Sequence, residues 1–236
     1  MSGHPAVNAD PGVQLGYPAA RVADQELALG DGARLRSGTI LYAGSRIGER
    51  FETGHNVVVR EQCEIADDVS VWSNTVIDYG CRIGAGVKIH TNCYVAQYTE
   101  IGPGAFLAPG VTIANDLYPG SAESAEVMSG PQIGAGAQLG VNVTVLPFVR
   151  IGENCLVGAG SVVTRDLPAG TVAFGNPARV RGLVGELEDI GSRIQPDDGS
   201  AARFRFSSDT GSDHDGGTTT DTDPALAAGV KLEVAG

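Results

Sequence analysis

Histidine is the side chain whose charge changes nearest neutral pH, and this chain of 236 residues contains only four. His214 lies in the stretch GSDHDGGTTTDTDP, which is too polar to build a site of its own. His90 and His55 lie within the patterned part of the chain. His90 is therefore the first candidate for a base or an orienting group, and His55 is the second.

A second set of candidates is spaced by eighteen residues. Tyr79, Gln97 and Asn115 follow one another at this interval, so we expect them to stack in one exposed column, and Asp116 comes next in the chain. The same interval separates Trp72 from His90. Amide and carboxylate groups can hold a substrate rich in hydroxyl or amino groups. Asp116 has an ordinary alternative role, because aspartate often hydrogen-bonds nearby backbone amides in turns.

The four cysteines are Cys63, Cys81, Cys93 and Cys155. They form no CxxC pair and show no spacing typical of a metal site. Cys63 and Cys81 are eighteen residues apart, so they stack in register, which is poor geometry for a disulfide. We expect buried free thiols and no metal.

A period of six residues positions these side chains. Fourteen of the fifteen residues reached in steps of six from Leu29 to Ile113 are Ile, Leu or Val, and Thr53 is the exception. The pattern resumes at Ile133 and continues to Val163. A second column, four residues after each aliphatic, is small throughout except at Phe51. Turn-forming triplets such as Gly-Ala-Gly fill the gaps between the columns.

This pattern predicts a parallel β-helix with three short faces and eighteen residues in each coil, stacked at strand spacing. A β-sandwich with coincidental spacing is the ordinary alternative. We divide the chain into an N-terminal segment 1–28, the β-helix 29–170, a segment 171–185 packing on it, and a mostly disordered acidic tail 186–236. Residues 115–132 interrupt the period, and we interpret them as a long excursion loop, which is usually functional.

Charge and hydropathy exclude several classes of function. The net charge is −12, with 28 acidic and 16 basic residues, which argues against binding nucleic acid through a basic surface. The tail carries over half of this charge. No apolar run is long enough to span a membrane, and the first residues do not resemble a signal peptide. We expect a cytoplasmic protein.

The segments VKIHTNCYVAQYTEIGPGAFLAPGVTIANDLYP, VGAGSVVTRDLPAG and GNPARV resemble the hexapeptide-repeat acyltransferases. The resemblance covers roughly residues 45–182 and is strongest to N-acetyltransferases of nucleotide-linked amino sugars, as in polysaccharide biosynthesis. It implies a left-handed β-helix, a homotrimer, and acetyl-CoA bound between neighbouring subunits.

The resemblance also assigns roles to single residues. Five positions match those that meet acetyl-CoA: Gly140, Ala159, Thr164, Arg165 and Arg179. Small residues leave room for a thin pantetheine arm, and arginine suits phosphates. Asn115 and Asp116 match a pair that faces the sugar, and His90 matches a position in the site.

One departure bears on the reaction. Many members that acetylate hydroxyls carry a histidine in the excursion, and residues 115–132 contain none. We therefore predict N-acetylation of an amino sugar to which a nucleotide diphosphate is attached. O-acetylation of a sugar or small molecule and a non-enzymatic assembly protein remain alternatives. A carbonic anhydrase of this fold needs three histidines, and the repeat region has two.

Overall fold

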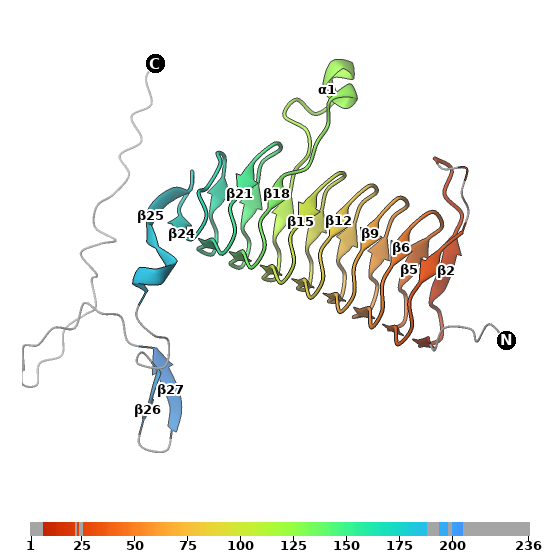
Figure 1. Ribbon diagram of the computed structural model, residues 1–236, viewed down its shortest axis with the longest axis horizontal. Helices are drawn as coiled ribbons and strands as arrows, with labels where there is room; N and C mark the ends of the chain where they lie inside the picture. The colour runs from red at the N-terminus through yellow and green to blue at the C-terminus, as the bar shows by residue number, and fades with distance from the viewer. Residues whose placement is uncertain (1–6, 22, 24–25, 188–193, 198–199, 205–236) are drawn as a thin grey trace, which may run out of the picture. The chain divides into compact units, whose positions relative to one another are not determined.

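The computed structural model describes residues 7–21, 23, 26–187, 194–197 and 200–204. The chain divides into two units, 1–187 and 188–236. In the first unit, short strands stack into three parallel sheets, and the chain visits the sheets in turn (Figure 1). None of the helices in the described residues is long and apolar enough to cross a membrane.

Each sheet takes every third strand of the stack. The first sheet contains β1 (Asn8–Ala9), β4 (Arg34–Leu35), β7 (Glu52–Thr53), β10 (Ser70–Val71), β13 (Lys88–Ile89), β16 (Phe106–Leu107), β19 (Gln138–Leu139), β22 (Leu156–Val157), β24 (Thr171–Phe174) and β25 (Arg179–Leu183). The second contains β2 (Gln14–Tyr17), β5 (Ile40–Tyr42), β8 (Val58–Val59), β11 (Val76–Ile77), β14 (Tyr94–Val95), β17 (Thr112–Ile113), β20 (Thr144–Val145) and β23 (Val162–Val163). The third contains β3 (Ala28–Leu29), β6 (Arg46–Ile47), β9 (Glu64–Ile65), β12 (Arg82–Ile83), β15 (Glu100–Ile101), β18 (Gln132–Ile133) and β21 (Arg150–Ile151).

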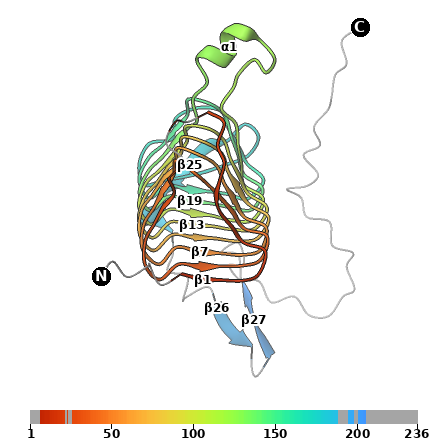
Figure 2. The same ribbon diagram turned by 90° about the vertical axis from the view of Figure 1, so that its right-hand side faces the viewer.

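The two sequence columns form the core of the coil. The aliphatic residue ends each two-residue strand and is buried from Leu35 onward, while the strand residue before it faces outward. The smaller residues of the second column are buried as well, and Phe51 fits among them fully buried. Viewed along its axis, the backbone of the coil winds around a common interior (Figure 2), and the buried side chains of the two columns form the core there. The predicted parallel β-helix is confirmed, while its left-handed sense stays a prediction.

The coil begins earlier than the sequence analysis placed it. β1 pairs in parallel with β4, β2 with β5, and β3 with β6, so residues of the segment 1–28 form the first coil. Val7 and Val13 pack against the core and already follow the period of six. The period was hidden because extra residues between β2 and β3 shift the phase.

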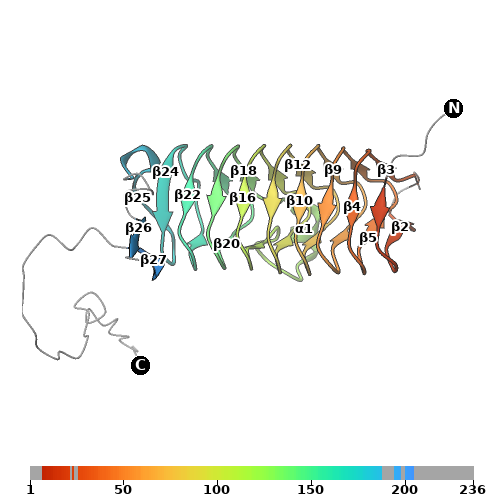
Figure 3. The ribbon, with the colours of Figure 1, turned by 90° about the horizontal axis from the view of Figure 1, so that it is seen from below.

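The excursion leaves the stack after β17 and returns at β18, and it contains the short helix α1 (Ala122–Glu126). β15 still pairs with β18, and β17 with β20, in the ordinary register. Seen from below, the strands on either side of the excursion follow one another without a break (Figure 3). The excursion is therefore an insertion at one corner that leaves the coil intact.

The C-terminal part of the first unit closes the stack. β24 extends the first sheet in parallel beside β22, and β25 folds back antiparallel onto β24. The 3₁₀ turn Val184–Glu186 follows. In the second unit, β26 (Ile194–Asp197) and β27 (Ser200–Phe204) form an antiparallel pair. The predicted disorder of 186–236 falls mostly on residues 188–193, 198–199 and 205–236, which lie outside the described residues.

All four cysteines are buried free thiols, as expected from their column. Burial raises the pKa of Cys93 to about 11, so this thiol stays protonated at neutral pH. Its position in the interior gives it a packing role.

Candidate functional site

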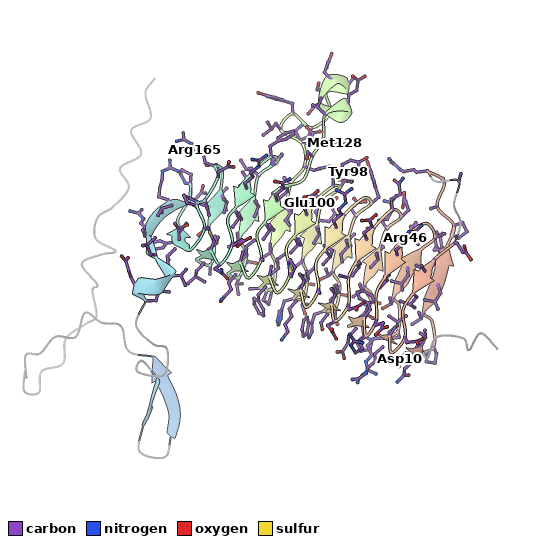
Figure 4. All side chains as sticks on the ribbon, viewed as in Figure 1. Asp10, Arg46, Tyr98, Glu100, Met128 and Arg165 are labelled. Atoms are coloured by element: carbon purple, nitrogen blue, oxygen red, sulfur yellow. The ribbon has the colours of Figure 1, made fainter. Side chains whose placement is uncertain are left out.

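The outward candidates lie on two corners of the coil, one at each edge of the second sheet. The first corner is the stack of turns between the first and second sheets, and it includes His55, Trp72 and His90. The second corner is the stack of turns between the second and third sheets, and it includes Gln97, Asn115 and the excursion. Figure 4 shows Tyr98, Met128 and Arg165 along the edge from which the excursion rises.

On the first corner, His90 belongs to a ladder of planar rings. Its imidazole stacks on the Trp72 indole with ring centroids 4.4 Å apart and planes 8° apart. The Phe106 ring lies 4.8 Å from His90 in a tilted arrangement. His90 is partly exposed, and no side-chain hydrogen bond holds its ring within the described residues. His55 differs, because its Nδ1 lies 2.9 Å from the Ser37 hydroxyl.

On the second corner, a buried carboxylate holds two amides in line. Asp78 Oδ2 accepts hydrogen bonds from Gln97 Nε2 at 2.6 Å and from the Tyr94 hydroxyl at 2.9 Å. Asp78 Oδ1 accepts from the backbone N–H of Tyr79 at 2.8 Å. Gln97 Oε1 in turn accepts from Asn115 Nδ2 at 2.6 Å. We call Asp78, Gln97 and Asn115 the amide relay.

The relay fixes which end of Asn115 faces outward. An ionised carboxylate only accepts hydrogen bonds, so Gln97 must turn its NH₂ group toward Asp78 and its oxygen toward Asn115. Asn115 must then donate to Gln97, and the same nitrogen lies 3.5 Å from Met128 Sδ. The Asn115 Oδ1 atom has no partner among the described residues. The second corner therefore presents a free acceptor at the base of the excursion.

Tyr79 corrects one sequence expectation. It was placed on an exposed strip with Gln97 and Asn115, but it is 6% exposed. The Arg21 guanidinium covers its ring at 4.6 Å from the centroid, and Tyr98 packs edge-on against it at 5.4 Å. Arg21 comes from the extra residues between β2 and β3, whose path the period of six did not predict. Tyr79 supports the corner from within.

An ion pair between the buried Glu61 and the partly exposed Arg60 continues the same network one coil before Asp78. Glu61 is 1% exposed and pairs with Arg60, with Nε and Oε2 2.9 Å apart. Burial pushes the pKa of Glu61 up, but the Arg60 hydrogen bond and Arg21 outweigh it and hold the pKa below its usual range. Arg60 also lies 3.4 Å from Asp78 Oδ1. These charges keep the Asp78 end of the relay rigid.

Asp116 serves the excursion itself. Its Oδ1 accepts hydrogen bonds from the backbone N–H of Tyr118 at 2.9 Å and from the Ser124 hydroxyl. Asp116 therefore stabilises the turn that leads into α1, the ordinary role weighed above. Next to it, apolar side chains of the excursion and Phe148 enclose a cavity of about 220 Å³. A role for Asp116 in substrate binding stays a prediction.

The residues expected to meet acetyl-CoA are split between the two corners. Gly140 and Ala159 lie on the first corner, and Thr164 and Arg165 lie on the second. A Cβ on Gly140 would come within 2.6 Å of Ala159 N, so the wall there admits no side chain. Arg165 is exposed, as is Arg179, which begins β25 and donates to the carbonyl of Ala178.

Within one chain, the structure therefore brings Gln97, Asn115 and Asp116 together but leaves His90 on the other corner. Sequence reasoning missed Asp78, Tyr94 and Met128. Asp78 was detectable, because Arg60 precedes it by one coil and Gln97 follows it by one coil and one residue. Among the described residues, no group of three or more His, Cys, Asp or Glu side chains is arranged to hold a metal ion.

Comparison with known proteins supports the repeat. Residues 80–115 and 130–165 match the model of the family described as bacterial transferase hexapeptide (six repeats). No curated protein sequence matches the chain.

Solved structures give partial matches. A maltose O-acetyltransferase from Clostridium difficile 630 is 32% identical, with a TM-score of 0.42, over 54% of this chain and 66% of that one. Soybean serine acetyltransferase is 34% identical, with a TM-score of 0.37, over 43% and 40%. LpxA from Acinetobacter baumannii is 18% identical, with a TM-score of 0.47, over 78% and 74%. The chain thus spans less than two thirds of the length of the maltose O-acetyltransferase and of the soybean serine acetyltransferase. Residues 80–115 and 130–165 thus carry the hexapeptide repeat that this family model describes.

Proposed function

We propose that the chain is an acetyl-CoA-dependent N-acetyltransferase that acts, as a cytoplasmic homotrimer, on an amino sugar linked to a nucleotide diphosphate. The observation that carries this proposal is the amide relay. It presents the Asn115 oxygen as a hydrogen-bond acceptor beside a scaffold of transferase-type repeats. An acceptor atom at this place suits a substrate group that donates hydrogen bonds, such as an amine.

The second sheet supports the trimer. Its outward residues are uncharged: Ile40, Val58, Val76, Tyr94, Thr112, Thr144 and Val162. The outward residues of the third sheet alternate instead between arginine and acidic or amide groups over most of its length. An uncharged, β-branched face suits burial against a second copy of the chain.

In a trimer whose three second sheets face the threefold axis, neighbouring subunits would also complete the site. Each copy would bring the first corner of one subunit against the second corner of the next, because these corners are the two edges of that sheet. His90, Gly140 and Ala159 of one subunit would then face Asn115 and Arg165 of its neighbour. In this arrangement the residues that lie apart in one chain share one cleft.

The acceptor side of the reaction follows from the relay. An uncharged amine donates one N–H to Asn115 Oδ1. This hydrogen bond aims the lone pair of the amine nitrogen into the cleft. The nitrogen attacks the acetyl carbonyl of acetyl-CoA, and a C–N bond forms. The C–S bond then breaks, and the CoA thiolate leaves and takes up the proton that the amine nitrogen releases. The His90 ring has no hydrogen-bond partner among the described residues, so in this proposal it relays that proton or orients the amine.

The donor side uses small residues and arginines. The backbone N–H of Ala159 has no partner in the described part of the chain, so it is free for a pantetheine amide or for the oxyanion of the tetrahedral intermediate. Gly140 leaves the wall beside it bare. Thr164, Arg165 and the remaining donors of Arg179 meet phosphate groups in this proposal, through hydroxyl and guanidinium N–H groups.

An acetyl-transfer assay with matched acceptors tests the proposal. We expect acetyl-CoA to be consumed with a nucleotide-linked amino sugar, and not with the same compound bearing a hydroxyl in place of the amine. Asn115 Oδ1 also accepts a hydrogen bond from a hydroxyl, so O-acetylation is the alternative that the second substrate detects. Absence of turnover with both, together with no binding of CoA, would favour an assembly protein.

A further inference from the structure

The first corner contains a cavity that the proposed reaction does not use. It has a volume of about 250 Å³ and lies below His90, on the N-terminal side. The residues that line it include Arg36, Glu52, His55 and Trp72. Figure 4 places Asp10, which lies 3.7 Å from Arg36, on the edge of the coil opposite Tyr98. The cavity is therefore well separated from the excursion.

A missing rung in the ring ladder creates this cavity. Arg36, residue 54, Trp72 and His90 occupy the same turn position in successive coils, and residue 54 is glycine. A Cβ on Gly54 would collide with the backbone nitrogen of Ser73, so no side chain can occupy this rung. His90 covers one face of the Trp72 indole, and the other face turns toward the gap.

The gap between Trp72 and Arg36 has room for one aromatic ring that contacts both side chains. Neighbouring coils are roughly 4.8 Å apart, so Trp72 and Arg36 are roughly 9.6 Å apart along the stack. A ring at the empty rung would lie roughly 4.8 Å from each, within the range of aromatic stacking. The observed spacing of 4.4 Å between His90 and Trp72 shows that this column stacks rings at the coil repeat.

We propose that this cavity binds the nucleobase of the acceptor substrate, between the Trp72 indole and the Arg36 guanidinium. Arginine stacks on aromatic faces, and its charge adds a cation–π attraction to the π-face of a base. The Glu52 carboxylate accepts hydrogen bonds from ring N–H or amino groups at the edge of a base. The inference deepens the proposed function, because that function supplies the link between the base and an amino sugar.

The position of the cavity agrees with a substrate that is longer than a sugar. Along the first corner, Gly140 and Ala159 lie on the C-terminal side of His90, and the cavity lies on the N-terminal side. A base at Trp72 would extend its sugar toward His90, where the acetyl group is delivered. From its N-terminal to its C-terminal end, the first corner would then contact the base of the acceptor, then present His90, and then form the wall of the acetyl-CoA site.

Intrinsic fluorescence tests this directly, because Trp72 is the only tryptophan of the chain. The full-length protein is titrated, without acetyl-CoA, with the diphosphates of uridine, thymidine, cytidine and guanosine. We expect saturable quenching by at least one of them and none by inorganic pyrophosphate, which lacks a ring. Arg36→Gln should weaken this binding roughly tenfold. Arg34→Gln is the matched control, because this exposed arginine lies in the same coil but outside the cavity.

Two results would overturn the inference. One is quenching by none of the four nucleotides, and the other is equal affinity in the Arg36→Gln and Arg34→Gln variants. The proposed function fails separately. If the nucleotides bind as expected but no amino sugar is acetylated, the base site stands and the activity does not. If acetylation proceeds with the same acceptor KM in Arg36→Gln and in Arg34→Gln, the activity stands and the base lies elsewhere.

Discussion

Replacing Asp78 by asparagine should reverse the polarity of the amide relay. The side chains have the same shape, but asparagine offers an NH₂ group where Oδ2 accepts from Gln97 and Tyr94. Gln97 then lowers its energy by turning its oxygen toward residue 78, which points its NH₂ group at Asn115. Asn115 must turn as well and would present a donor where the substrate amine needs an acceptor.

The structure sets the size of both effects. Tyr94 is 37% exposed, so its hydroxyl can turn to water, and the fold loses about one charge-assisted hydrogen bond. We expect a stability loss of about 2 kcal/mol. At the site, an acceptor bond to the amine is lost and two donors face each other. A cost of about 2–3 kcal/mol there lowers kcat/KM roughly 30- to 150-fold.

Urea unfolding and acetyl-transfer kinetics measure the two effects separately. Tyr94→Phe is the control, because it removes one donor to Asp78 but leaves the relay polarity unchanged, and kcat/KM should fall less than about threefold. The double variant Asp78→Asn with Gln97→Glu is the decisive test. The carboxylate at 97 accepts from both neighbours, so Asn115 again presents its oxygen. If the double variant is no more active than Asp78→Asn, polarity is not what the relay contributes.

Four further outcomes are expected. His90→Ala should lower kcat by on the order of 10²–10⁴ and leave the Kd of CoA unchanged; turnover equal to the natural chain at neutral pH would make this histidine a bystander. Arg165→Ala should weaken CoA in a calorimetric titration by roughly tenfold and spare the acceptor KM; an unchanged Kd would place the phosphates elsewhere. Burial and the hydrogen bond to Asp78 raise the pKa of Tyr94 to about 12, above its unfolded value of about 10. The stability that this group contributes is therefore complete below pH 10 and is lost as the pH rises toward 12. Tyr94→Phe should make the urea midpoint depend less on pH over that window. Ending the chain after Leu187, the last residue of the first unit, should leave the thermal midpoint within about 3 °C and preserve acetyl transfer; a larger fall would show that residues 188–236 support the coil.

The fold was predictable because each inward position repeats every six residues. The columns ending at Val163 predicted every strand from β4 to β23, and the break after Ile113 located the excursion. The first coil was missed because the insertion between β2 and β3 changes the phase, so local spacing no longer reports the stacking. The C-terminal antiparallel strand β25 pairs only with β24 among the described strands, and no further coil stacks on it. Its residues therefore do not follow the period of six.

The site was predictable by column but not by contact. The interval of eighteen correctly placed Trp72 beneath His90 and Gln97 beside Asn115. It could not show that Arg21 would cover Tyr79, since Arg21 lies outside the period. The relay bond between Asp78 and Gln97 joins residues nineteen apart, one step off the column, so it depends on side-chain reach. The distribution of candidates over two corners follows from the path of the turns, which the two-residue strands fix.

The excursion has a consequence for how such a chain can change. Because β15 pairs with β18 as if nothing lay between them, the length of the segment after Ile113 is free of the geometry of the coil. Residues can be gained or lost there while Gly140, Ala159 and the turns around them keep their positions. In the proposed function the excursion contacts the sugar and these turns contact acetyl-CoA, so the contacts to the sugar can change without altering those to acetyl-CoA. A segment grafted at this corner would change the surface beside Asn115 while the coil and the turns at Gly140 and Ala159 stay as they are.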